Sequence, residues 1–181
     1  MVYVSSVLLL GLIGVKIAVN FLLGLYKMDD YFIIKGAYTE EAKVHSLQFD
    51  GLAAPNPGEG TAGAVLLLDE KVVAEIGDYI GETGITNNFA EYTGLLAGLQ
   101  MAQALNVENL LIQGDSNLVV NQVAGKWKVE NKDLKDLHAM VHSMFTTFKF
   151  VAIKHVYRDK NKLADAITNE VLRDKKDFMR S

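Results

Sequence analysis

From His45 onward, short apolar runs alternate with amphipathic segments in an order that only a few folds can accommodate. Alternating or continuous apolar runs predict strands, and apolar residues three or four positions apart predict helices. The predicted order is three strands (47–50, 62–68 and 72–79), a helix (88–105), a strand (109–113), two helices (116–123 and 133–148), a strand (150–156) and a closing helix (161–172). Strands joined by tight turns run antiparallel, whereas parallel strands need a longer crossover. The order therefore predicts an α/β domain with a five-stranded mixed sheet flanked by helices.

The first 27 residues differ in composition from the rest of the chain. Residues 2–26 are apolar apart from Ser5, Ser6, Lys16 and Asn20, and as a helix they are long enough to span a bilayer. They lack the leading positive charge and the cleavage site of a secretory signal peptide. Lys16 near the centre would be costly in lipid. We favour an apolar N-terminal helix that anchors the protein in a membrane, and the alternatives are an interfacial helix or a true start at Met28.

We divide the chain into this apolar segment (1–27), a linker (28–44) and a globular domain (45–181). The linker mixes acids, a short apolar patch and Gly36, which is typical of a tether with at most one strand. Half of all residues are apolar and only two are prolines, which excludes a disordered chain. The absence of cysteine excludes a disulfide scaffold, a thiolate zinc site and a thiol nucleophile.

The charges divide the domain into two parts. Between His45 and Val120 there is one basic residue against ten acids, a net charge of −9. From Asn121 to Ser181 there are 13 basic residues against 8 acids, a net charge of +5. An acidic part beside a basic part suits metal-dependent chemistry on a polyanion.

Four carboxylates lie at the ends of predicted strands or the starts of predicted helices. Asp50 closes the first strand and Asp115 the fourth, whereas Glu91 and Asp165 lie in the first turns of two helices. Ligands collect at such positions in α/β sheets. Four converging acids need a divalent cation as counter-charge, and oxygen-only ligation favours Mg²⁺ or Mn²⁺ over zinc.

Each acid also has an ordinary structural explanation when it is taken alone. Asp115 followed by Ser116 fits a helix N-cap, and Glu91 fits an acid favoured by the helix dipole. Asp50 before Gly51 fits turn chemistry. The hypothesis of a site therefore depends on the four acids occurring together with their neighbours.

These neighbours resemble the ribonuclease H type 1 family from about His45 to Leu172. Four strings occur in the order and at the spacing of that family: FDGLAAPNPG (49–58), TNNFAEY (86–92), QGDSNLVVNQVAGKW (113–127) and HVYRDKNKLADAITNEVL (155–172). Bacterial members carry a longer loop with a histidine before the last acid. The short loop 157–160 is more similar to the archaeal and plant-like form.

The resemblance implies a ribonuclease H-like fold and a metal-dependent endoribonuclease that hydrolyses the RNA strand of RNA–DNA hybrids. It implies two Mg²⁺ ions, with Mn²⁺ as the alternative, and products that carry a 5′-phosphate and a 3′-hydroxyl. Asp50 would bind both ions, Glu91 and Asp115 would hold one, and Asp165 would hold the other.

Four asparagines match family positions that touch the hybrid near the cut: Asn56, Asn87, Asn88 and Asn117. Amides suit this task because a 2′-hydroxyl needs both donors and acceptors. Asn87 fits a helix cap or a left-handed turn equally well. Leu52, Ala53 and Ala54 offer no polar side chain, so some substrate contacts there must come from the backbone.

Arg158 in the shortened loop is the candidate for handling a phosphate or the product. The structural alternative is an ion pair with Asp159 or Asp165. We favour the functional role.

A rival hypothesis keeps the fold but makes the domain a nucleic-acid-binding or accessory module with little catalysis. A third makes the protein a membrane-associated adaptor. All four acids are present, which favours the enzyme. We expect a cytoplasmic monomer, attached to a membrane if residues 2–26 span one.

Overall fold

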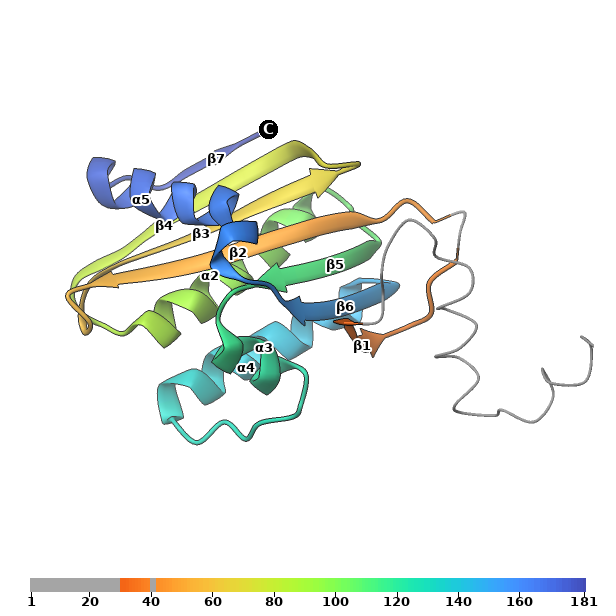
Figure 1. Cartoon of the computed structure of the whole chain (residues 1–181), viewed down its shortest axis with the longest axis horizontal. Helices are drawn as coiled ribbons and strands as arrows, with labels where there is room; N and C mark the ends of the chain where they lie inside the picture. Colours follow the sequence, from red (N-terminus) through yellow and green to blue (C-terminus); the bar gives the residue numbers. More distant parts are fainter. Residues whose placement is uncertain (1–29, 40–41) are drawn as a thin grey trace, which may run out of the picture.

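A computed structural model describes residues 30–39 and 42–181, so the predicted N-terminal helix (1–27) lies outside the described residues. The chain forms a seven-stranded sheet in the order β1-β6-β5-β2-β3-β4-β7 (Figure 1). The strands are β1 (Phe32–Lys35), β2 (His45–Ala54), β3 (Gly58–Leu68), β4 (Lys71–Ile85), β5 (Asn109–Gly114), β6 (Phe150–His155) and β7 (Phe178–Arg180). The helices are α2 (Asn87–Ala104), α3 (Asn117–Val123), α4 (Lys132–Met144) and α5 (Lys162–Asp174), with 3₁₀ helices at Phe145–Thr147 and Arg158–Lys160.

The strand directions confirm the predicted mixed sheet. β2, β3 and β4 form an antiparallel meander. β5 runs parallel to both β2 and β6. This arrangement brings the C-terminal end of β5 beside the middle of β2.

The predicted number of five strands is wrong, because β1 and β7 extend the sheet at its two edges. β1 pairs antiparallel with β6 and packs Phe32 and Ile34 against the main core. It lies within residues that we expected to form a linker with at most one strand. β7 pairs antiparallel with β4 and sets Arg180 opposite Glu75. Segments of four and three residues are too short to show a periodicity. Their strand conformation therefore depends on the sheet edges that they meet.

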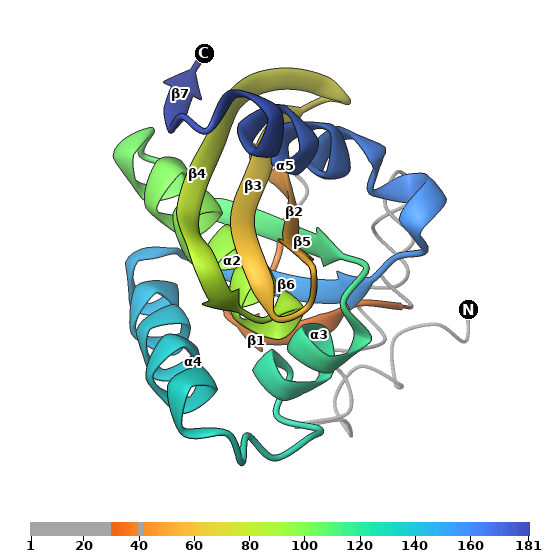
Figure 2. The ribbon, with the colours of Figure 1, turned by 90° about the vertical axis from the view of Figure 1, so that its left-hand side faces the viewer.

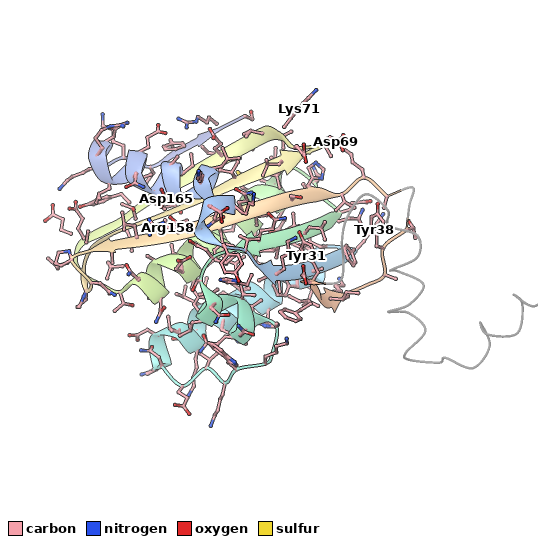
Figure 3. All side chains as sticks on the ribbon, viewed as in Figure 1. Tyr31, Tyr38, Asp69, Lys71, Arg158 and Asp165 are labelled. Atoms are coloured by element: carbon pink, nitrogen blue, oxygen red, sulfur yellow. The ribbon has the colours of Figure 1, made fainter. Side chains whose placement is uncertain are left out.

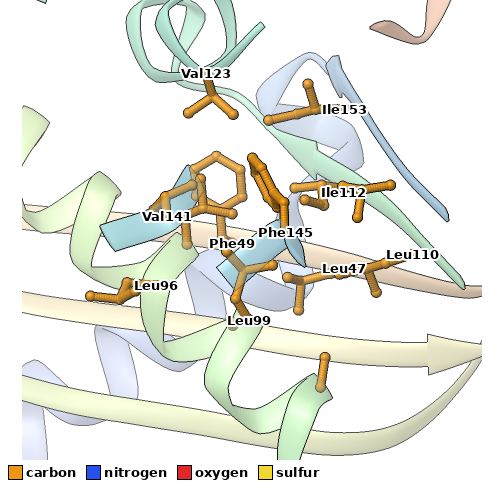
Figure 4. Packing of buried hydrophobic residues seen from close by; sticks show 14 of the residues in the cluster. Leu47, Phe49, Leu96, Leu99, Leu110, Ile112, Val123, Val141, Phe145 and Ile153 are labelled. Atoms are coloured by element: carbon orange, nitrogen blue, oxygen red, sulfur yellow. The ribbon is translucent and has the colours of Figure 1, made fainter. Parts of the chain in front are cut away.

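Helices cover both faces of the sheet (Figure 2). On one face, Leu47 and Phe49 of β2 belong to the main hydrophobic core. Its members also come from α2, α4, the 3₁₀ helix after α4 and the parallel strands: Leu96, Leu99, Leu110, Ile112, Val141 and Phe145 (Figure 4). On the other face, Val65 and Leu67 pack against Ile167 and Val171 of α5. Successive strand residues point to opposite faces, so Asp50, next to Phe49, points away from the main core.

The described residues, 30–39 and 42–181, contain no helix with both the length and the apolar character needed to cross a membrane. The predicted anchor falls on residues outside these ranges.

Candidate active site

Asp50 and Asp115 are brought together by the parallel pairing of β2 with β5. Phe49 lies opposite Gly114, the last residue of β5, so Asp115 leaves the sheet beside Asp50. The prediction that Asp50 closes its strand is wrong, because β2 continues to Ala54 along the antiparallel ladder with β3. Asp50 is therefore held inside a strand, opposite Gly63 of β3, as a turn residue would not be.

Glu91 reaches the same place from α2. This helix begins at Asn87, and the Thr86 hydroxyl caps it by accepting from the Phe89 N–H at 3.3 Å. Glu91 consequently lies in the second turn, not in the predicted first turn, and the dipole explanation for it loses its basis. Two glycines set the approach of α2 to β2. A Cβ at Gly51 would collide with the backbone of Ala90 and Glu91, and one at Gly94 would collide with the Asp50 carbonyl oxygen.

These three residues form a compact group of acids. Asp50, Glu91 and Asp115 each offer one carboxylate oxygen, and the three oxygens lie within 4.8 Å of one another. Asp50 is only 8% exposed, and the Glu91 Oε2 is buried without a hydrogen-bond partner. The group could hold a metal ion.

Burial and mutual repulsion disfavour the charged forms of two of these acids. Burial, together with the charges of Asp115 and Asp165 and against a hydrogen bond from Thr168, raises the pKa of Asp50 to about 6. Burial, followed by the charges of Asp50 and Asp115, raises the pKa of Glu91 well above its usual value. A cation among the three oxygens would remove this penalty.

Two neutral side chains that were not predicted as site residues support the acids. Asn161 is fully buried, and its Nδ2 donates to the Phe49 carbonyl at 2.8 Å and to the Asp115 Oδ1 at 3.0 Å. The Thr168 Oγ1 lies 2.9 Å from the Asp50 Oδ2. Thr168 follows Asp165 by three positions and so shares its helix face, a spacing that could have indicated it.

Asp165 occupies the predicted first turn of α5 but lies outside the group of three. Its Oδ1 accepts from the Arg158 Nη2 at 2.6 Å (Figure 3). The structural alternative for Arg158, an ion pair with Asp165, is therefore present. The pair also raises the pKa of Arg158, through its hydrogen bond and charge.

The predicted substrate-binding asparagines lie at the starts of α2 and α3 and in the β2–β3 turn. The Asn87 Oδ1 accepts from the Ala53 N–H at 2.8 Å, and the Asn56 Oδ1 accepts from the Asn87 N–H at 3.1 Å. Asn87 thus has a structural role, although it is not the cap of α2. Asn88 is exposed in the first turn. The Asn117 Oδ1 accepts from the Asn121 side chain at 2.6 Å.

The N-cap of α3 is Ser116, whose hydroxyl accepts from the Val119 N–H at 3.4 Å. Asp115 is therefore not the capping residue, and its carboxylate points to Asn161 and the acidic group instead.

Residues 48–171 match the family described as reverse transcriptase-like. The chain is also 40% identical to the ribonuclease HI of Halobacterium salinarum over 133 residues, 73% of this chain and 65% of that protein. The chain belongs to the ribonuclease H type 1 family. The archaeal relative agrees with the short form predicted from the loop.

The structural neighbours are members of the same family. The N-terminal RNase H domain of Rv2228c from Mycobacterium tuberculosis is 34% identical with a TM-score of 0.69, and the match covers 74% of this chain and 96% of that one. LC11-RNase H1, solved in complex with an RNA/DNA hybrid, is 29% identical with a TM-score of 0.67, and the match covers 74% and 99%. These matches confirm the predicted ribonuclease H-like fold.

The family members differ in length. The chain spans about two thirds of the Halobacterium protein, and 35% of the full bifunctional Rv2228c, to which it is 36% identical over 128 residues. The match therefore establishes the fold and the family.

Proposed function

We propose that this protein is a ribonuclease H, a metal-dependent endonuclease that hydrolyses the RNA strand of RNA–DNA hybrids. The observation that carries the proposal is the acidic group of Asp50, Glu91 and Asp115, whose oxygens lie within 4.8 Å of one another. The register of β2 with β5 and the close approach of α2 to β2 at Gly51 and Gly94 place these three acids together. The fold therefore determines the group. Membership of the ribonuclease H family supports the same reaction.

The chemistry of the site fits a divalent cation of the Mg²⁺ or Mn²⁺ class. All donors are carboxylate oxygens, which these hard cations prefer. The buried Glu91 Oε2 has no hydrogen-bond partner, and Asp50 has a raised pKa, so both acids gain from a positive charge. Asn161 and Thr168 would hold Asp115 and Asp50 in place.

We propose that Asp165 completes the set and that the four acids would hold two ions, with Asp50 contributing to both. When bound, such a pair of ions lowers the pKa of a water and neutralises charge on the leaving 3′ oxygen, which would give 5′-phosphate and 3′-hydroxyl ends. An ion held by the Asp165 carboxylate would compete with its bond to Arg158. Arg158, once released, would be positioned to contact a phosphate of the substrate or product.

The hybrid would be recognised by amides beside the acids. Asn56, Asn87 and Asn88 lie together at the N-terminus of α2, and Asn117 lies at the N-terminus of α3. Amides can both donate to and accept from a ribose 2′-hydroxyl, which distinguishes RNA from DNA. A neighbour solved with an RNA/DNA hybrid supports this choice of substrate.

Incubation of the full-length protein with a labelled hybrid tests the proposal. We expect RNA cleavage in Mg²⁺ that stops in EDTA and in Asp115→Asn, while single-stranded DNA stays intact. Hybrid RNA that survives in both Mg²⁺ and Mn²⁺ would refute the enzyme. Binding without cutting would instead identify a nucleic-acid-binding module.

We also propose a cytoplasmic monomer attached to a membrane by residues 2–26, on the basis of their apolar sequence alone. Fractionation of cells that express the full chain and a version starting at Met28 tests the attachment. Equal solubility of the two versions would contradict it, and light scattering of the purified protein would test the monomer.

A further inference from the structure

Tyr157 is the most exposed of the large apolar side chains in the described part of the chain, at 78%. It lies two residues after the end of β6, and the intervening Val156 N–H donates to the Gly114 carbonyl at 3.0 Å. Tyr157 therefore emerges one residue after the chain is fastened to the C-terminal end of β5, next to Asp115. Single exposed apolar residues are common, so the exposure alone means little. The surroundings of this ring are what set it apart.

The ring is braced against the backbone of the acidic group. Tyr157 stands edge-on to the His155 imidazole, with ring centroids 5.7 Å apart and an angle of 82°. The His155 Nε2 in turn lies 3.1 Å from the Asp115 carbonyl oxygen. The Tyr157 carbonyl accepts from the Lys160 N–H at 2.8 Å, which fixes the backbone on the other side. A ring that already has a packing partner loses less conformational entropy when it meets a ligand than a free one.

Basic residues follow Tyr157 closely in the sequence. Arg158, Lys160 and Lys162 follow it within five residues, and all three are exposed. Asp159 is the one acid among them. Exposed cations attract a phosphate backbone whatever its sequence. This short segment therefore offers charge for phosphates and, at Tyr157, a flat apolar surface beside them.

We propose that Tyr157 packs its ring against a sugar of the hybrid beside the cut and so sets how tightly the substrate is held. The bases of a duplex are covered by their stacked neighbours, whereas the sugars of an A-form helix are displayed in a wide, shallow minor groove. An aromatic ring at the rim of the site therefore meets sugars. This inference rests on the proposed ribonuclease H function and adds a substrate contact to it.

The phenol takes no part in the bond change, so its loss should affect binding and leave the chemical step intact. We expect Tyr157→Ala to raise both the KM for the hybrid and the Kd measured in Ca²⁺ by about fivefold to tenfold, at the low end of aromatic contacts with nucleic acid. The kcat should stay within about twofold of the wild type. Tyr157→Phe keeps the ring and should behave like the wild type. Met140→Ala, which removes a 48% exposed side chain from α4, is the matched control and should change nothing.

The experiment uses the full-length protein, with thermal unfolding of each variant recorded first. A fall in kcat at unchanged KM would overturn the proposal, since it would mean that Tyr157 only positions Asp115 through His155. Equal losses in Tyr157→Ala and Tyr157→Phe would overturn the ring contact in favour of the hydroxyl. If the wild type is active and Tyr157→Ala leaves KM and Kd unchanged, this inference is refuted and the proposed function stands. A wild type that neither binds nor cuts the hybrid would sink the proposed function as well.

Discussion

All four acids near the site carry a carboxylate, but in opposite electrostatic situations. The two situations are those of the acidic group (Asp50, Glu91 and Asp115) and of the nearby Asp165. No ion pair joins any of the three to a cation in the described part of the chain, and two of them have raised pKa values. Asp165 instead holds Arg158 at 2.6 Å. The group of three acids needs a cation that the protein does not supply, whereas Asp165 is already paired with Arg158. The two should therefore respond differently to the same substitution.

The difference follows from how the fold builds each position. The three acids come from β2, the end of β5 and α2, elements locked by sheet register and by close backbone contact at Gly51 and Gly94. They cannot move apart to relieve their repulsion. Asp165 lies in the first turn of α5, where its carboxylate is partly exposed and reaches Arg158 on the preceding loop. It can exchange partners at little cost.

The largest effect should be on cleavage. Asp115→Asn removes one charge from a site that depends on three, and a lost cation costs several kcal/mol of transition-state stabilisation. We expect kcat/KM in Mg²⁺ to fall by about a thousandfold or more. Asp165→Asn removes a charge that Arg158 already balances in the metal-free protein and should cost about tenfold to a hundredfold. Equal losses in the two variants would remove the distinction between the acids.

Neutralising an acid of the group should lower cleavage but raise the stability of the metal-free protein. Asp50 has its pKa raised from 3.8 to about 6 in the folded protein. The folded state therefore binds the proton more tightly than the unfolded chain, so stability is lost as the pH rises from about 4 to about 6 and the full penalty is present above pH 6. We expect Asp50→Asn in EDTA to raise the free energy of unfolding by about 2 kcal/mol near pH 8. The gain should fade as the pH falls through 6 towards 4, because the native carboxyl is then protonated.

Urea unfolding of Asp50→Asn at about pH 8 and about pH 5 measures this gain. Asp165→Asn is the matched control: it loses the pair with Arg158 and removes only a minor part of the repulsion on Asp50, so its gain should be much smaller. Stabilisation of Asp165→Asn by the same amount, or a gain for Asp50→Asn that grows towards low pH, would contradict the repulsion argument.

The sequence predicted which residues gather at the site better than it predicted how they are held. The motifs located all three acids of the group, and the alternation of elements predicted the parallel strands that join Asp50 to Asp115. Asp50 was expected at a strand end because Gly51 resembled a turn signal. In the structure Gly51 instead allows α2 to touch β2, a requirement that only tertiary contact reveals.

The parts that the sequence missed depend on contacts between distant segments. β1 and β7 are strands because they meet the exposed edges of β6 and β4, and neither has enough residues to show a pattern. Asn161 supports Asp115 across 46 positions. In the sequence, the position of Asn161 before α5 indicates only an ordinary helix start. Its burial in the structure shows that it also supports Asp115.

Replacing Arg158, the partner of Asp165, tests the same comparison through the arginine. If Arg158 contacts a phosphate once Asp165 releases it, Arg158→Gln should lower kcat/KM at saturating Mg²⁺ by about tenfold, the loss of one charge-assisted contact. The salt dependence of KM should become shallower by about one charge. Lys128→Gln, in the α3–α4 connection, serves as a charge-matched control for general attraction. An equal loss in both variants would assign Arg158 no special position.

The smallest effect should be on the metal requirement. Arg158 and the ion compete for the Asp165 carboxylate, so Arg158→Gln should lower the Mg²⁺ concentration that gives half-maximal cleavage. The Arg158–Asp165 pair is solvent-exposed on the arginine side, and exposed ion pairs contribute about 1 kcal/mol or less. The shift should therefore be about threefold, measured by titrating Mg²⁺ at a saturating concentration of hybrid. Asp159→Asn, which keeps Arg158 and its pair with Asp165, should leave the midpoint unchanged. An increased Mg²⁺ requirement in Arg158→Gln would mean that the arginine holds Asp165 ready for the ion and does not compete with it.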